Sequence, residues 1–207
     1  MQRAAALIFD LGNVVFRCSM SNAYAYWARA SGLTSKTIAQ RIDLEHTAHY
    51  DFEKGLISED EFWEFVSSSI RSSLSRADFV TGWNSIYEDE VVGVRSILDT
   101  LARQHRLIAL TNTNATHAKV WRARYADVLS RFELVIASHE IAARKPEVEA
   151  YEACIRYLAV TTDEIILFDD RAENVKAASR LGLRTVLVSS FDQMRRELRS
   201  MSLAGGF

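Results

Sequence analysis

Short apolar runs that alternate with helical patterns constrain the fold of this 207-residue chain more than any other feature. The runs are residues 4–9, 106–110, 133–137, 164–168 and 184–188. A short run without polar alternation is typical of a strand that is buried on both faces, as in a parallel sheet. The sequence therefore predicts a buried sheet whose strands are widely separated along the chain.

Helical patterns fill most of the gaps between these runs. Residues 89–104 place apolar side chains on one helical face. Residues 146–158 begin with Pro146, the only proline of the chain, which suits a first helical turn. Residues 171–181 lead to Gly182, a typical C-cap residue. Alternation of strand and helix predicts an α/β fold with a doubly wound parallel sheet.

One long segment interrupts this alternation. Residues 17–87 show no strand run and several helical patterns, including a capping box at Ser58–Glu61 and a second helix start at Ser75. An insertion after the first strand would stand over the crevice at the carboxyl ends of the strands, where α/β sheets bind ligands. We expect an α/β core of residues 1–16 and 88–207 and a small helical cap of residues 17–87.

Composition narrows the class of protein. Hydrophobic residues make up 48% of the chain, charged residues 25%, and the net charge is −2. This balance argues against disorder, and no basic patch favours a nucleic-acid or membrane partner. Two cysteines are too few for a disulfide framework, and the amino-terminal apolar run is too short for a signal peptide. We expect a cytoplasmic protein that is a monomer or a weak homodimer.

Polar residues stand where the predicted strands end or a helix begins. They are Asp10, Thr111-Asn112, Lys145 and Asp169-Asp170. Each alone is compatible with a helix cap, a turn or a solvated side chain. The carboxyl ends of parallel strands meet at one edge, so their joint occurrence predicts a single site.

The chemistry of such a site follows from its residue types. Carboxylates from two strand ends suit Mg²⁺, which would let an anionic carboxylate approach a phosphate. A carboxylate nucleophile can form a covalent acyl phosphate and divide hydrolysis into two easier steps. The Thr111 hydroxyl, a backbone N–H near Asn112 and the Lys145 ammonium would supply donors to the phosphoryl oxygens.

Four motifs resemble those of a known family. IFDLGNVV (8–15), LTNTN (110–114), ARKP (143–146) and LFDDRAENVKAA (167–178) are similar to the four motifs of the haloacid dehalogenase superfamily. The likeness is greatest to the subgroup that contains α-D-glucose-1-phosphate phosphatase and the amino-terminal phosphatase domain of soluble epoxide hydrolases. It extends over nearly the whole chain, including the early helical segment.

The resemblance implies a magnesium-dependent phosphatase and a role for each residue. Asp10 would be the nucleophile and a magnesium ligand, and the backbone carbonyl of Gly12 would also bind the metal. Thr111 and Asn112 would hold the phosphate, and Lys145 would bridge nucleophile and phosphoryl group. Asp169 and Asp170 would complete the metal site, one directly and one through water, while Asn174 would support their loop.

Gly12 departs from the family pattern. Most phosphatases of this superfamily have a second Asp two residues after the nucleophile, as general acid and base. Losing such a group typically costs about 10²- to 10⁴-fold in rate. The cost shrinks when the leaving group is already acidic, as an anomeric hydroxyl is. We therefore expect a small phosphorylated metabolite as substrate, with a sugar phosphate such as a hexose 1-phosphate favoured.

Two other functions remain open at this point. Gly12 is compatible with a non-catalytic phosphate-binding or regulatory protein. A phospho-accepting receiver module also uses Asp, Thr, Lys and an acidic pair, but in another order and without a cap. Substrate contacts from the cap would come from His46, His49, Tyr50, Trp83 or Arg17, although packing or solvation is the expected role of each. The tail Phe191–Phe207 is expected to be a helix followed by Gly205-Gly206.

Overall fold

The computed structural model describes residues 4–203 and contains the predicted parallel sheet. Five strands pair in the order β5-β4-β1-β6-β7, and every pairing is parallel. The strands are β1 (Ala6–Phe9), β4 (Arg106–Thr111), β5 (Leu134–Ala137), β6 (Ile165–Asp169) and β7 (Arg184–Leu187). All five coincide with the predicted runs to within two residues.

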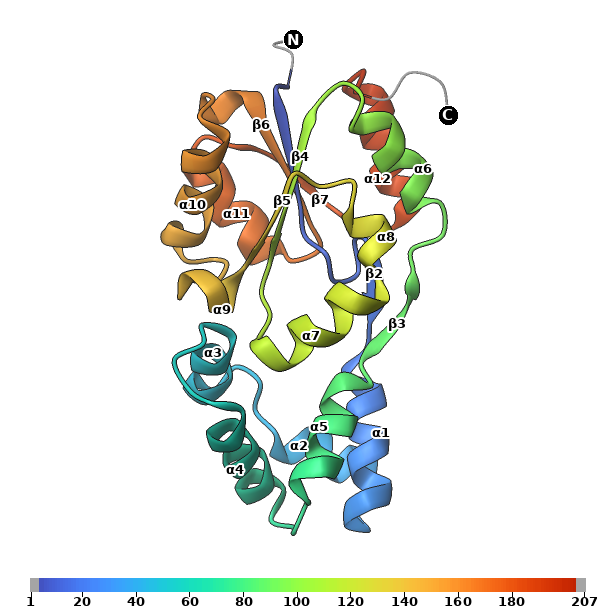
Figure 1. The fold of residues 1–207 in the computed structure, drawn as a ribbon, viewed down its shortest axis with the longest axis vertical. Helices are drawn as coiled ribbons and strands as arrows, with labels where there is room; N and C mark the ends of the chain where they lie inside the picture. Colours follow the sequence, from blue (N-terminus) through green and yellow to red (C-terminus); the bar gives the residue numbers. More distant parts are fainter. Residues whose placement is uncertain (1–3, 204–207) are drawn as a thin grey trace.

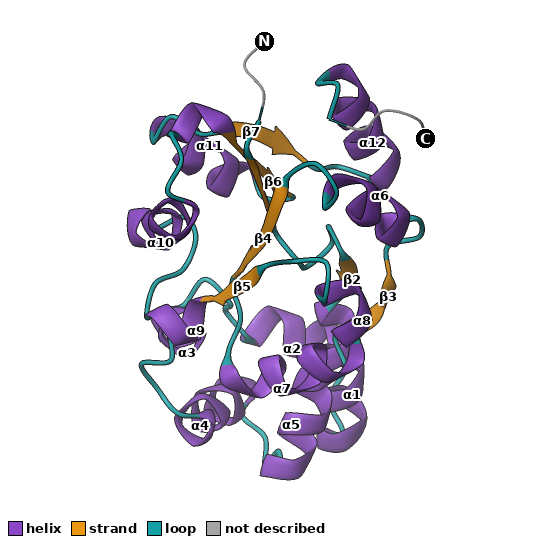
Figure 2. Cartoon of the chain, turned by 45° about the horizontal axis from the view of Figure 1, so that its top comes forward, coloured by secondary structure: helices purple, strands orange, loops and turns teal. Residues whose placement is uncertain are grey.

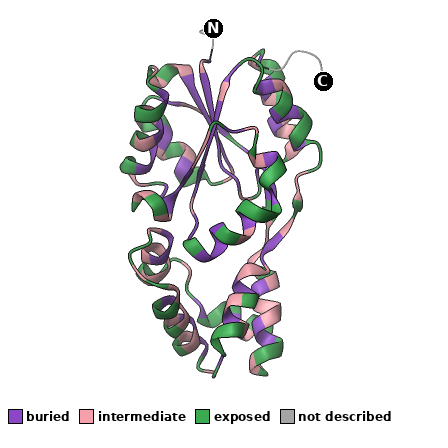
Figure 3. Ribbon diagram, viewed as in Figure 1, coloured by how far each residue is buried: buried purple, intermediate pink, exposed green. Residues whose placement is uncertain are grey.

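Helices cover both faces of the sheet (Figures 1 and 2). On one face α10 (Val148–Leu158) and α11 (Ala172–Arg180) pack against alternate strand residues such as Ile8 and Leu167. On the other face α6 (Val94–Leu101) and α12 (Phe191–Ser200) pack against Leu7, Phe168 and their neighbours. Because both faces are covered, the strands are almost wholly buried, as Figure 3 shows. The sheet is therefore the doubly wound type that the sequence predicts.

The segment between β1 and β4 forms a second layer of helices. It contains α1 (Met20–Ser31), α2 (Ser35–Arg41), α3 (Thr47–Glu53), α4 (Glu59–Ile70) and α5 (Arg76–Asn84). We call residues 20–84 the helical insert. It lies beyond the carboxyl ends of the sheet strands, opposite the two termini (Figure 1). Its apolar residues, among them Trp27, Phe62 and Trp83, belong to the same continuous hydrophobic cluster as one face of the sheet.

Two short strands that the sequence analysis missed join the helical insert to the sheet. β2 (Phe16–Cys18) and β3 (Tyr87–Glu90) form a separate antiparallel pair. The expectation of no strand in residues 17–87 is therefore wrong at both ends of that segment. These strands have three and four residues, and β3 reads Tyr-Glu-Asp-Glu, which gives no apolar run to detect.

Two predicted helices begin later than expected. The helix predicted over 89–104 is α6 and starts at Val94, because β3 occupies residues 87–90 and Gly93 turns the chain with φ +88°. α10 starts at Val148 and not at Pro146. A turn over residues 144–147 precedes it, closed by a 2.7 Å bond from the Glu147 N–H to the Arg144 carbonyl.

Four further helices lie in the connections between the sheet strands. They are α7 (Ala115–Arg124), α8 (Ala126–Leu129), α9 (Ser138–Ile141) and a short 3₁₀ helix, Thr162–Glu164.

Several local predictions are confirmed. Ser58 and Glu61 form the expected reciprocal capping box of α4, and Ser75 caps α5. Gly182 follows α11 with φ +87°, the left-handed conformation that ends a helix. The predicted tail helix is α12, while Gly205-Gly206 lies outside the described residues. Within residues 4–203 no helix is long and apolar enough to span a bilayer.

Candidate active site

Asp10 stands at the carboxyl end of the central strand β1. Its backbone N–H continues the sheet by donating to the Phe168 carbonyl at 2.8 Å. Oδ1 of its carboxylate accepts from the Leu11 N–H at 2.7 Å and lies 3.0 Å from Nζ of Lys145. Within residues 4–203 the other oxygen, Oδ2, accepts no hydrogen bond. One oxygen of Asp10 is thus fixed by the protein, and the other is available to a ligand.

Lys145 is a buried cation between two carboxylates. Its side chain is 1% exposed, and Nζ lies 2.6 Å from Oδ2 of Asp169 and 3.0 Å from Oδ1 of Asp10. Its backbone is held by the Asn112 amide, which accepts from the Lys145 N–H and donates to the Lys145 carbonyl, both at 2.8 Å. The Asn112 side chain therefore fixes the lysine loop, and a phosphate contact from this residue would use its backbone N–H.

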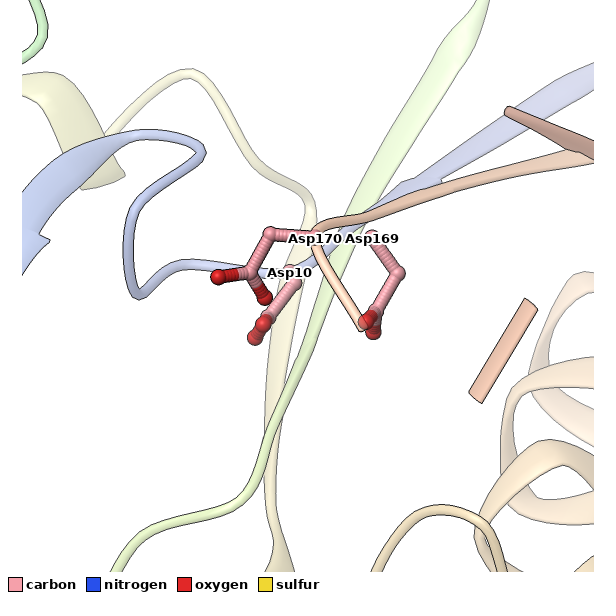
Figure 4. A group of neighbouring side chains, drawn as sticks. All are labelled: Asp10, Asp169 and Asp170. Atoms are coloured by element: carbon pink, nitrogen blue, oxygen red, sulfur yellow. The ribbon is translucent and has the colours of Figure 1, made fainter. Parts of the chain in front are cut away.

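The two consecutive aspartates at the end of β6 have different surroundings. Asp169 is fully buried, and its Oδ1 accepts from the Arg171 N–H and from Nδ2 of Asn174, both at 2.9 Å. Asp170 is partly exposed, and Nδ2 of Asn13 donates to its Oδ2 at 3.3 Å. In Figure 4 the carboxylates of Asp170 and Asp10 lie next to each other, and that of Asp169 is turned the other way. Asp170 is thus the better placed of the pair for direct contact with a ligand beside Asp10.

The three carboxylates form a site that fits a divalent cation. One oxygen from each of Asp10, Asp169 and Asp170 lies within 4.8 Å of the others. Two strand ends therefore supply hard oxygen ligands, which are the donors that Mg²⁺ prefers, with room for waters. The donor set fits magnesium.

Excess negative charge shapes the protonation of this cluster. Burial raises the pKa of Asp10 to about 7; Asp169 and Asp170 add to the rise, and the Lys145 ammonium opposes it. Burial alone would lower the pKa of Lys145, but the carboxylates of Asp10 and Asp169 raise it above its ordinary value. Three carboxylates share one ammonium, so an added cation would relieve the repulsion between them.

Two adjoining cavities open above the strand ends. The smaller, about 180 Å³, is lined by Asp10, Lys145, Asp170 and their neighbours. The larger, about 330 Å³, extends toward the helical insert. Gly12, Thr111 and Asn112 border both cavities, and so does Glu53 at the end of α3. The arrangement offers a small charged pocket for a phosphate and a larger chamber for the group attached to it.

Position 12 has space for a side chain. A Cβ built on Gly12 would meet Sγ of Cys18 at 3.9 Å, an ordinary contact, and nothing closer. The glycine is therefore not required by steric crowding. Cys18 is half-buried beside the larger cavity, and Cys154 is buried.

The structure brings most of the predicted site residues to one place. The smaller cavity is lined by Asp10, Gly12, Thr111, Asn112, Lys145, Asp170 and Asn174, and Asp169 supports it through hydrogen bonds with Lys145 and Asn174. Among the residues considered in the helical segment, His49, Tyr50 and Trp83 line the larger cavity. Arg17 and His46 are exposed and border neither cavity.

Four charged residues of the cavities were missed by the sequence analysis: Glu45, Glu53, Arg144 and Arg171. Glu53 and Arg144 form a buried ion pair, with Nε 2.7 Å from Oε2, and Arg171 borders both cavities. Arg144 stands directly before Lys145, inside the ARKP motif, which was a usable signal. Glu53 lies in a short helix far along the chain, and only the folded geometry reveals its position.

Comparisons with known proteins identify the family. The family model of the haloacid dehalogenase-like hydrolases matches residues 4–182, and this match covers most of the chain. The chain belongs to the haloacid dehalogenase-like hydrolase family. Its motifs and its doubly wound sheet agree with that membership.

The sequence identity between this chain and individual relatives is low. The chain is 26% identical to a phosphatase from Mycobacterium tuberculosis, over 95% of this chain and 94% of the relative. It is 25% identical to drimenol cyclase from Aspergillus calidoustus over 95% of this chain, and it spans 36% of that protein's length. A HAD family enzyme from Bacteroides thetaiotaomicron, solved with magnesium and inorganic phosphate, superposes with a TM-score of 0.77 at 23% identity, over 91% and 96% of the two chains. This last likeness shows a shared fold.

Proposed function

We propose that this hydrolase is a magnesium-dependent phosphatase that transfers a phosphoryl group to Asp10 and then to water. The observation that carries the proposal is the Asp10 carboxylate, fixed at one oxygen by Leu11 and Lys145 and open to a cavity at the other. Magnesium between Asp10 and Asp170 would neutralise the phosphate and let the free oxygen of Asp10 approach phosphorus. Names of relatives support this reading, since one is a phosphatase and another a phosphorylated carbohydrates phosphatase.

Each remaining residue has a role in this proposal. Lys145 would hold the nucleophile and a phosphoryl oxygen, and the Thr111 hydroxyl would donate to another. The Gly12 carbonyl and Asp170 would bind the metal with Asp10. Asp169 would orient Lys145 and reach the metal through water, because its oxygens already accept from Lys145, Arg171 and Asn174. Residues 17–87, which contain the helical insert, would act as the cap that closes the chamber.

The substrate class follows from the chamber and from Gly12. We propose a small phosphorylated metabolite, with a sugar phosphate such as a hexose 1-phosphate favoured. A cavity of about 330 Å³ lined by Glu45, His49, Tyr50 and Arg144 offers both polar partners and aromatic faces to a sugar. An acidic anomeric leaving group would also depend least on a proton donor at position 12.

A panel of phosphorylated metabolites, assayed with magnesium and with a chelator, tests the proposal. We expect phosphate release that needs magnesium and that disappears in Asp10→Asn. Asp89→Asn is the matched control, because that side chain is fully exposed and its 3.7 Å contact with Arg124 contributes little. Preference for simple alkyl phosphates over sugar 1-phosphates would contradict the substrate class.

One observation favours a second candidate function. Position 12 carries no side chain, which suits a phosphate-binding protein without turnover. Magnesium-supported phosphate binding with no release from any member of the panel would support that function and contradict the first.

A further inference from the structure

A histidine and a glutamate that have no role in the proposed phosphoryl transfer line the cavities. His49 and Glu53 are four residues apart on α3 and therefore share one face of that helix. Both line the larger cavity, and Glu53 also borders the smaller one beside Asp10 and Lys145. Their side chains are only 15% and 11% exposed. The pair therefore lines the chamber into which the group attached to a phosphate at Asp10 would extend.

The hydrogen bonds of His49 define which of its nitrogens can exchange a proton. Nδ1 lies 2.7 Å from the Leu44 carbonyl, which can only accept, so Nδ1 carries a hydrogen. Nε2 is the atom left to gain or lose a proton. It faces Oε1 of Glu53 at 3.8 Å, which is too long for a hydrogen bond and leaves Nε2 available to a third atom.

Glu53 is itself held in place. Its Oε2 accepts from Nε of Arg144 at 2.7 Å, and its backbone carbonyl accepts from Oγ of Ser138 at 2.6 Å. The guanidinium of Arg144 also lies 4.0 Å over the Tyr50 ring. These contacts tie the end of α3 to the loop that carries Lys145. The pair is therefore fixed relative to the nucleophile although it comes from the helical insert.

We propose that His49, held by the Leu44 carbonyl and facing Glu53, is the proton donor and acceptor of this site, in place of the side chain absent at Gly12. The inference rests on the proposed phosphatase function. As Oδ2 of Asp10 bonds to phosphorus, the bond from phosphorus to the leaving oxygen breaks, and that oxygen takes the proton from Nε2. Water then bonds to phosphorus as the bond to Asp10 breaks. One water proton passes to Nε2, and phosphate leaves.

The charged groups around His49 come from several elements. Glu53 and Tyr50 share its helix, and Glu45 borders the same cavity. Arg144 and Arg171 face the cavity from the sheet side. His117 of α7 is fully buried and holds no charge near neutral pH, because burial lowers its pKa to about 3. Glu53 is thus the charged group that directly faces Nε2, at 3.8 Å.

The test compares His49→Asn with His46→Asn on two substrates, glycerol phosphate and nitrophenyl phosphate. Asn at 49 can still donate to the Leu44 carbonyl and lacks Nε2. His46 is the matched control: it is the exposed N-cap of the same helix, its ring stacks on Phe65 outside both cavities, and Asn is a good N-cap residue. We expect His49→Asn to lose about 100-fold or more on glycerol phosphate and about tenfold or less on the nitrophenyl ester. His46→Asn should resemble the wild type on both.

Two further readouts separate proton transfer from a structural role. Gly12→Asp should restore the activity of His49→Asn on glycerol phosphate, since position 12 has space for a carboxylic acid. The loss of wild-type kcat/KM at high pH should also disappear in His49→Asn. Equal losses on both substrates, or no rescue by Gly12→Asp, would overturn the role of His49. Wild-type activity with an unaffected His49→Asn variant would overturn this inference alone, whereas an inactive wild type would overturn the proposed function as well.

Discussion

The strand-end half of the site and the α3 half are built in different ways. Asp10, Lys145 and Asp169 come from the ends of the sheet and an adjacent loop, with side chains between 0% and 12% exposed. Backbone N–H groups and short ion pairs fix them. His49 is held within the helical insert by the Leu44 carbonyl, and the ion pair of Glu53 and Arg144 joins that insert to the loop that carries Lys145. The first half is rigid because sheet geometry dictates it, and the second depends on how two layers of the molecule pack.

The sharpest test of the strand-end half is Lys145→Met. Removing the ammonium leaves two buried carboxylates without their shared partner, so we expect the free energy of unfolding to fall by about 3–5 kcal/mol without magnesium. Chemical denaturation with and without magnesium measures this. Magnesium should recover more stability in Lys145→Met than in the wild type, because it replaces the lost positive charge. Equal recovery in the two proteins would mean that the cation does not bind this cluster.

A smaller loss is expected when the link between the two halves is broken. Arg144→Met or Glu53→Gln removes one partner of a hydrogen-bonded ion pair that is 8% and 11% exposed. We expect each to cost about 1.5–3 kcal/mol of stability. The double variant should cost less than the sum of the two, and a double-mutant cycle measures the coupling. Additive losses would show that the pair does not join the halves.

His117, which lines the larger cavity and belongs to neither half, and Asp10 of the strand-end half should make stability depend on pH in opposite directions. The pKa of His117, which donates from Nε2 to the Trp83 carbonyl of the helical insert, is lowered by burial from 6.5 to about 3. Its contribution to stability is therefore present above its unfolded-state pKa and is lost as the pH falls toward 3. We expect a loss of about 2 kcal/mol between about pH 6.5 and about pH 5.

The variant His117→Gln tests whether His117 causes this loss of stability at acid pH. A Gln amide can still donate to the Trp83 carbonyl but does not titrate, so stability should depend less on pH below 6.5. The contribution of Asp10 to stability depends on pH in the opposite direction. Its pKa is raised, so in the metal-free protein its contribution is full below 3.8 and declines as the pH rises toward 7. If stability fell at acid pH in His117→Gln as much as in the wild type, the loss would come from other groups.

The smallest effect should come from the helical insert alone. Ser58→Ala removes the side-chain cap of α4 and should cost about 1 kcal/mol of stability. Because this helix start contributes no residue to either cavity, catalytic rates at saturating magnesium should not change. A large loss of activity would show that the insert and the site are coupled more tightly than these contacts indicate.

The strand-end half could be predicted from the sequence, and the α3 half could not. Asp10 and Asp169-Asp170 each follow a buried apolar run, and strand ends in a parallel sheet converge whatever the loops do. Lys145 was recognisable from its motif. Glu53 and His49 lie on a seven-residue helix whose orientation depends on packing, so their place beside Asp10 could not be derived from spacing.

Specific contacts in the folded chain, most of them between segments far apart in the sequence, explain the smaller differences. The strand β3 carries the sequence Tyr-Glu-Asp-Glu and forms because β2 pairs with it, a long-range contact that no local pattern shows. The start of α10 is moved past Pro146 by the turn that Glu147 closes with Arg144. The Asn112 side chain holds the Lys145 backbone, which was not visible before the two loops were placed together.

Detection of the phosphorylated protein tests the central claim most directly. Magnesium-loaded protein would be mixed with a radiolabelled hexose 1-phosphate, quenched within a single turnover and mapped by peptide. We predict a hydroxylamine-sensitive phosphoryl group on Asp10 that decays as phosphate appears and that is absent from Asp10→Asn. Release of phosphate with no label on the protein at any time would contradict a phospho-aspartate intermediate on Asp10.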